Sequence, residues 1–157
     1  MKLAARYDIE APVDFAYRAV TDFEAWQHLA AQRGASVTRK DPPGGPGQGS
    51  EWQVSFPFRA KTRNATLHLV TASPTSQMTV SASSKLVDGE VTVELLNLGA
   101  NRTRIEVRLE ARPKTLAARI YVQTLRLARK KLEANFSKRV AQFAADLEDS
   151  YRRPSAR

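Results

Sequence analysis

The chain has 157 residues, of which 42% are hydrophobic and 26% are charged, and its formal net charge is +9. This length suits one globular domain, and the balance of apolar and charged residues excludes a disordered chain. The absence of cysteine excludes disulfides, thiol chemistry and metal centres held by cysteine thiolates.

Membrane and export signals are not expected in this sequence. No stretch approaches the roughly 20 apolar residues that a membrane-spanning helix needs. Residues 1–6 lead into Tyr7 and Asp8 before any apolar run develops, so no signal peptide is expected. The sequence therefore predicts a soluble, cytoplasmic protein.

The positive charge is concentrated in one part of the chain. Residues 102–139 hold 12 basic and 3 acidic residues, whereas the rest of the chain holds 13 of each. Such an excess is either a solvated face or a docking surface for an anionic partner, such as a membrane or RNA. The candidates for such a surface lie on the basic C-terminal helix predicted below, and they are Arg119, Arg126, Arg129, Lys130, Lys131 and Lys138.

The first third of the chain predicts a strand, two short helices and a second strand. Residues Lys2–Ile9 alternate between apolar and polar, which is typical of a half-buried strand. Pro12 suits the start of a helix, and Asp22 suits the N-cap of a second helix that ends at Gly34. A short strand over 35–40 then leads into a loop over 41–49, which is rich in glycine and proline.

Period-two alternation continues through the middle of the chain and predicts an antiparallel meander. The run 50–58 alternates, although Pro57 suggests an edge position or a bulge. Turn residues separate the later strands. The apolar positions of these strands are Trp52, Val54, Phe56, Phe58, Leu67, Leu69, Met78, Val80, Ala82, Val91, Val93, Leu95, Ile105, Val107, Leu109 and Ala111.

From residue 115 to about residue 149 there is no glycine or proline, and apolar residues recur every three or four positions. This pattern predicts one amphipathic helix about 50 Å long. An antiparallel sheet with one apolar face needs a cover, and only this helix is long enough. The sequence therefore predicts a single α+β domain over residues 1–150, followed by a basic tail over 151–157.

Several segments, in order, resemble the START/Bet v 1-like (SRPBCC) superfamily, and within it the bacterial polyketide cyclase/dehydrase and lipid-transport-like members. They are Ile-Glu-Ala-Pro-Val-Asp at 9–14, Thr-Asp-Phe-Glu-Ala-Trp at 21–26, the glycine-rich loop at 44–50 and the strand beginning at 102–105. The resemblance implies a helix-grip fold, in which a curved antiparallel sheet of six to seven strands wraps a long C-terminal helix.

The resemblance also implies a cavity between sheet and helix for a small hydrophobic molecule, such as a lipid, sterol, quinone or polyketide. No catalytic residue set and no cofactor follow from it. The inward strand positions and the helix over 116–127 would line the cavity. The predicted ligand-binding residues are Tyr7, Trp52, Val54, Phe56, Leu67, Leu69, Met78, Val80, Val93, Leu95, Val107, Leu109, Leu116, Ile120, Tyr121, Thr124 and Leu127.

The residues that could carry chemistry are few. His28 and His68 are the only histidines, and neither has a glutamate or histidine three or four residues after it, so no metal site is predicted. The strand carboxylates alternate with the apolar positions and should form an outward ladder of ion pairs.

Beside a docking module for an anionic membrane or RNA surface, two functions of the inner face remain open on this sequence. The first is non-enzymatic binding or transport of a hydrophobic ligand, favoured by an inner face that carries almost no charge. The second is an enzyme of the cyclase or aromatase kind, in which Tyr7, Tyr121 and Asn97 would act near the cavity.

Overall fold

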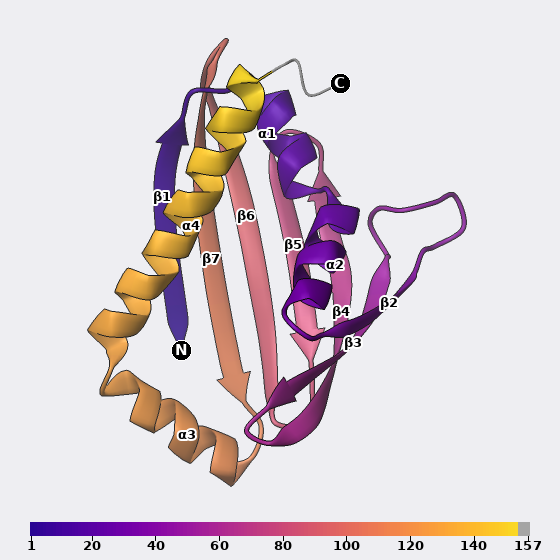
Figure 1. Cartoon of the computed structure of the whole chain (residues 1–157), viewed down its shortest axis with the longest axis vertical. Helices are drawn as coiled ribbons and strands as arrows, with labels where there is room; N and C mark the ends of the chain where they lie inside the picture. Colours follow the sequence, from indigo (N-terminus) through magenta and orange to yellow (C-terminus); the bar gives the residue numbers. More distant parts are fainter. Residues whose placement is uncertain (154–157) are drawn as a thin grey trace.

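The computed structural model describes residues 1–153 as one seven-stranded antiparallel sheet with four helices (Figure 1). The strand order is β1-β7-β6-β5-β4-β3-β2, so only β1 and β7 are neighbours from distant parts of the chain. In chain order the elements are β1 (Lys2–Ile9), α1 (Val13–Val20), α2 (Phe23–Gln32), β2 (Ser36–Lys40), β3 (Glu51–Phe58), β4 (Lys61–Ser73), β5 (Gln77–Ser83), β6 (Val87–Gly99), β7 (Arg102–Pro113), α3 (Leu116–Arg126) and α4 (Arg129–Arg152).

All helices lie on one side of the sheet, which we call its inner face (Figure 1). This arrangement is the predicted helix-grip fold, and the alternation in the sequence positions its strands correctly. In β1, for example, Ala5 and Ile9 are buried while Lys2 and Arg6 are exposed. The register pairs Val93 with Val107, and both point inward.

The outer face of the sheet carries the predicted ladder of ion pairs. Asp8 on β1 accepts hydrogen bonds from Arg104 on β7 at 2.8 and 3.2 Å. Arg108 bridges Glu94 on β6 and Glu106 on its own strand. These pairs are solvent-exposed, so each contributes little to stability, but together they keep the outer face polar.

The short helices begin where their caps predict. Asp22 accepts a hydrogen bond from the backbone N–H of Ala25 at 3.1 Å, which confirms it as the N-cap of α2. Pro12 precedes α1, whose Ala16 and Val20 are buried. The buried core joins α1, the second half of α4 and the sheet, and it consists of Ile9, Ala11, Ala16, Val20, Trp52, Leu69, Met78, Val93, Leu95, Ile105, Ala144 and Leu147.

The prediction of one continuous helix over 115–149 is wrong. The chain bends at Leu127 and Ala128, so α3 crosses the end of the sheet and α4 runs along β1 (Figure 1). The Thr124 hydroxyl donates to the Ile120 carbonyl at 3.0 Å, a back-bond that commonly bends helices. A straight helix of that length could not follow both the end of β7 and the edge strand of a curved sheet.

The end of α4 and the character of the helices can be compared with the sequence predictions. α4 continues to Arg152, beyond the predicted start of the tail at residue 151, and residues 154–157 of that tail lie outside the described residues. Among residues 1–153, no helix is both long enough and apolar enough to cross a membrane.

Candidate ligand-binding site on the inner face of the sheet

Burial along the inner face is graded. Beside α1 and α2 the face is closed: Trp52, Leu69 and Leu95 are buried against helical side chains. The Trp52 ring packs against Phe23 of α2 in a tilted arrangement with ring centroids 5.1 Å apart, and its indole N–H donates to Gln27 at 3.0 Å. These positions form core, because their contacts are already made by the chain itself.

Other inward positions are covered only in part. Half-buried side chains occur on five neighbouring strands, from β3 to β7, and we call this group the open inner face. Its members are Val54, Phe56, Leu67, Val80, Val91, Val107 and Leu109. The predicted ligand-binding residues therefore divide: Trp52, Leu69, Met78, Val93 and Leu95 are buried, and Val54, Phe56, Leu67, Val80, Val107 and Leu109 are half-buried.

Small residues cross the open inner face in register. Ala82 on β5 pairs with Gly89 on β6, which pairs with Ala111 on β7, and all three are half-buried. A Cβ at Gly89 would approach the Glu110 carbonyl oxygen at 3.3 Å and the Ala82 Cβ at 3.9 Å. This row therefore carries no side chain larger than a methyl group.

The β3–β4 hairpin closes onto α3 at one end of this face. Phe58 meets Tyr121 edge to face with centroids 6.3 Å apart, and the Arg59 guanidinium lies 4.2 Å from the Tyr121 ring centroid. Arg59 and Ala60, the two residues of the hairpin turn, have φ of 53° and 61°. Such left-handed values are unfavourable for residues other than glycine, asparagine or aspartate.

Arg63 brings a positive charge to the inner face, which sequence reasoning missed. It pairs in register with Phe56, two positions from the Val54–Ala65 pair, so its side chain leaves the same face as theirs. Its Nε is buried and has no hydrogen-bond partner among residues 1–153. The signal was present, since Arg63 has the same parity as Leu67 and Leu69 on one strand.

The polar residues suggested as reactive groups each have a structural partner. The Tyr7 hydroxyl contacts the Ser137 carbonyl oxygen at 3.1 Å and the Ser137 hydroxyl at 2.6 Å. Asn97 is exposed and accepts from the Gly99 N–H at 2.9 Å, which shapes the β6–β7 turn. Thr124 is exposed and bonds back to Ile120, and Tyr121 stacks under Arg59. The structure brings no two of these four polar groups into hydrogen-bond contact.

Three of the predicted lining residues lie on the wrong side of α3. Leu116, Ile120 and Leu127 are exposed, whereas Ala118 and Val122 form the buried side of the same helix. At 100° per residue, the first three positions fall opposite the last two. Because they lie opposite the buried side of α3, all three are exposed and lie off the inner face.

The histidines and acids do not form a centre. His68 lies on the outer face with its Nδ1 3.5 Å from a Glu51 oxygen, and the His28 ring contacts Gln32 on the exposed side of α2. No group of three or more His, Cys, Asp or Glu side chains that could hold a metal ion occurs in the described part of the chain.

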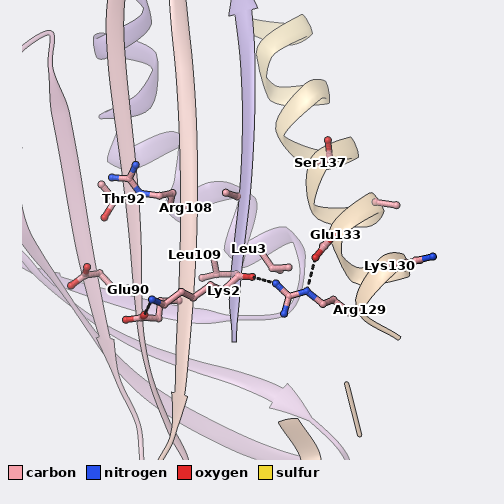
Figure 2. A pocket seen from close by; sticks show the side chains of 13 residues that line it. Lys2, Leu3, Glu90, Thr92, Arg108, Leu109, Arg129, Lys130, Glu133 and Ser137 are labelled. Carbon is pink, nitrogen blue, oxygen red and sulfur yellow. Dashed lines mark hydrogen bonds and ion pairs between the residues drawn. The ribbon is translucent and has the colours of Figure 1, made fainter. Parts of the chain in front are cut away.

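A groove of about 860 Å³ runs beside the edge strand β1, and Leu109 of the open inner face is one of its lining residues (Figure 2). Arg129 of α4 joins its walls, donating to Glu133 at 2.6 Å and to the Lys2 carbonyl at 3.5 Å. Lys2, then Arg112, lower the pKa of Glu110 in this groove. Charged side chains line this groove together with the apolar Leu3, Leu109 and Ala134, so it is not the purely apolar pocket that the sequence predicts.

A second, smaller groove of about 380 Å³ lies between α1 and α4. Phe15, Ala19, Phe143 and Leu147 contribute its apolar part. Neighbouring aromatic rings already pair with two of these side chains: Tyr151 with Phe15, and Trp26 with Phe143. The groove is therefore largely a seam between packed helices.

Comparison with solved structures identifies the same architecture in other proteins. The Zhui aromatase/cyclase from Streptomyces sp. R1128 is 13% identical, with a TM-score of 0.65, over 99% of this chain and 96% of that one. A norcoclaurine synthase mutant from Thalictrum flavum is 11% identical, with a TM-score of 0.64, over 96% and 95%. A START superfamily protein from Mycobacterium smegmatis is 15% identical, with a TM-score of 0.55, over 85% and 95%.

At these identities the structural likeness shows the fold alone. Comparison with curated protein sequences finds no match. A family model described as polyketide cyclase/dehydrase and lipid transport, however, matches residues 1–148, nearly the whole chain. The chain therefore belongs to the polyketide cyclase/dehydrase and lipid transport family.

Proposed function

We propose that this protein binds a small apolar molecule on the open inner face, as a binder or carrier and not as a catalyst. The family supports a module that binds hydrophobic ligands or acts as a polyketide cyclase. The observation that carries the choice of site is the partial exposure of inward side chains such as Phe56, Val80 and Leu109, while the rest of the inner face is closed.

The energetics favour a ligand at this place. Fully burying an apolar side chain gains about 1.5–3 kcal/mol relative to leaving it exposed. Half-buried side chains leave part of that free energy unused, and a lipid, quinone, sterol or polyketide-like molecule would recover it. The row formed by Ala82, Gly89 and Ala111 offers a surface without large side chains.

Arg63 adds a chemical preference to the proposed ligand. A buried guanidinium N–H without a partner is costly, and a carboxylate, phenolate or carbonyl oxygen is its natural acceptor. We therefore expect an apolar ligand that carries an oxygen acceptor near the β3–β4 hairpin.

Binding is favoured over catalysis by what the inner face lacks. The inward positions of β1 and of β3–β7, all among the described residues, carry no aspartate, glutamate or histidine. General acid–base catalysis at neutral pH normally uses such groups. The hydroxyl of Tyr7 is already engaged with Ser137.

A pair of fluorescent probes tests the proposal. Anilinonaphthalene sulfonate is apolar and anionic, and Nile red is apolar and neutral. We expect both to bind, and Arg63→Met to weaken the anionic probe by about tenfold or more through loss of a charge-assisted hydrogen bond while sparing Nile red. Arg6→Met, an exposed change on the outer face of β1, is the matched control.

Larger side chains at the row of small residues on the open inner face test whether a ligand occupies that space. Ala82→Leu with Ala111→Leu should abolish binding of both probes and keep or raise the melting temperature. If native side chains already fill that space, the added methylenes should instead destabilise the fold by about 1–3 kcal/mol. That outcome, or probe affinity unchanged by the filled face, contradicts the proposal, and Ala4→Leu on the exposed side of β1 is the control.

A further inference from the structure

Helix α3 has two apolar sides, and only one of them is used by the fold. Ala118 and Val122 are buried against the rest of the molecule. On the opposite side, Leu116 is 73% exposed, Ile120 57% and Leu127 90%. Their spacing of four and seven residues returns to the same line on the helix, so the three side chains form one continuous apolar strip, the α3 strip.

Positive charge surrounds the α3 strip. Arg119 and Arg126 are exposed on one flank of the helix, and Lys130 and Lys131 follow in the first turn of α4. None of these four takes part in an ion pair among residues 1–153, and α3 itself contains no acidic residue. The strip and its basic flank together form a surface with no internal partner in the described chain.

We propose that this surface docks the protein onto an anionic lipid bilayer, with α3 lying in the plane of the membrane. Amphipathic helices with aliphatic residues on one side and basic residues beside them bind in this way. The α3 strip would enter the boundary between headgroups and acyl chains. Arg119, Arg126, Lys130 and Lys131 would pair with lipid phosphates and carboxylates.

The side chains present favour a membrane over RNA. Proteins that bind single-stranded RNA stack its bases on aromatic rings, and the α3 strip is entirely aliphatic. Charge alone would suit either partner, but only a bilayer gains from burying three aliphatic side chains together with the charges. The proposal does not depend on the ligand, because the strip lies opposite the buried side of α3.

The expected strength is moderate and reversible. Each basic side chain near an anionic surface contributes about fivefold to the partition coefficient, so four contribute several hundredfold at low salt. Each methylene that leaves water contributes about fourfold more. Added salt should remove most of the electrostatic part and little of the apolar part.

Flotation of the full chain with vesicles tests the docking surface. The wild type should float with phosphatidylcholine–phosphatidylserine vesicles at low salt and stay unbound with phosphatidylcholine alone. L116Q/I120Q/L127Q and R119Q/R126Q should each lower binding to the mixed vesicles by about tenfold or more. The control L96Q changes a residue that is 54% exposed on β6, and R6Q/R33Q removes the same charge elsewhere, so both should float like the wild type.

Insertion can be measured separately, because the chain contains no cysteine. A polarity-sensitive NBD label at Leu127→Cys should brighten and shift to shorter wavelength with the mixed vesicles, whereas the same label at Leu96→Cys should not. No flotation at low salt, wild-type flotation of the triple glutamine variant, or RNA binding without flotation would each overturn the proposal. Melting temperatures of all variants show that any loss is not unfolding.

Discussion

Tyr7 lies on the inner face of β1, yet its hydroxyl reaches α4 and not a ligand position. The hydroxyl contacts both the carbonyl and the side chain of Ser137, 130 residues away in the sequence. A part-buried tyrosine hydroxyl needs a partner, and this one joins the edge strand to the helix that covers it. The residue therefore belongs to the structure of the domain.

Replacing Tyr7 with phenylalanine tests this role. We expect Tyr7→Phe to lower the free energy of unfolding by about 1 kcal/mol, because the Ser137 groups lose their partner. Tyr151→Phe removes an exposed hydroxyl that donates to Asn101, and it should have almost no effect. Urea unfolding measures both, and a Tyr7→Phe variant as stable as the wild type but inactive in ligand binding would contradict the structural role.

Asp8 makes part of the stability dependent on pH. The hydrogen bond from Arg104, joined by the charges of Arg104 and Arg102, lowers the pKa of Asp8 below its ordinary value of 3.8. A carboxyl with a lowered pKa in the folded state stabilises the fold above its unfolded pKa. That contribution is lost as the pH falls through the lowered pKa.

The expected consequence is a difference in acid sensitivity. Between about pH 5 and pH 2, the melting temperature of the wild type should fall further than that of Asp8→Asn, which has no carboxyl to protonate at this position. Asp14→Asn, a change in an exposed i,i+4 pair on α1, is the control and should follow the wild type. Equal acid sensitivity of wild type and Asp8→Asn would show that the pair with Arg104 contributes nothing.

Among the elements, the β3–β4 hairpin shows backbone strain beside the candidate site. Its two-residue turn puts Arg59 and Ala60 in the left-handed region, where a hairpin usually places asparagine and glycine. The Arg59 side chain uses that position to stack on Tyr121 of α3. Ala60 bears the same conformational cost, and its methyl side chain cannot stack on Tyr121 to offset that cost.

Relieving that cost should stabilise the hairpin. We expect Ala60→Gly to raise the free energy of unfolding by about 0.5–1 kcal/mol, since glycine adopts this φ without penalty and loses only some chain entropy. Ala100→Gly, in the β6–β7 turn where φ is not positive, should be neutral or destabilising. Thermal unfolding of the two variants gives the comparison, and a destabilised Ala60→Gly would mean that the turn is not strained.

The helices show where sequence reasoning stops. Apolar spacing correctly predicts that the C-terminal segment is helical, and Asp22 correctly predicts where α2 begins. The bend at Leu127 leaves no such signal, because the buried positions Val122 and Val140 stay in phase across it and no glycine or proline marks it. The bend depends on the curvature of the sheet, which alternation alone does not specify.

For the candidate site too, the sequence predicts which strand residues point inward but not how deeply each is buried. Strand parity placed the inward residues and would also have placed Arg63, had it been applied to charged positions. Parity could not separate the closed core at Leu69 and Leu95 from the half-buried positions such as Val80, since that difference depends on which helix lies above each row. Whether any of these positions binds a ligand stays a prediction.

At the scale of the whole molecule, stability is expected to be uneven. The α1 and α4 side of the sheet holds the buried core, whereas α3 contributes only Ala118 and Val122 to the buried side chains. Its other attachment is the stack of Tyr121 with Phe58 and Arg59. Elements with few buried contacts open locally at a free energy well below that of global unfolding.

Hydrogen exchange of backbone amides should show this difference directly. Amides of α3 should exchange much faster than those of β6 and β7 around Leu95 and Ile105. The substitution Arg59→Ala should accelerate exchange in α3 alone by about two- to fivefold, because it removes an exposed cation–π contact. Arg18→Ala, which removes a similar contact with Phe15 on α1, should leave α3 unchanged. Slow exchange throughout α3 would contradict the weak attachment of this helix. Acceleration of exchange by Arg59→Ala would identify the β3–β4 hairpin as a contact that holds α3 in place.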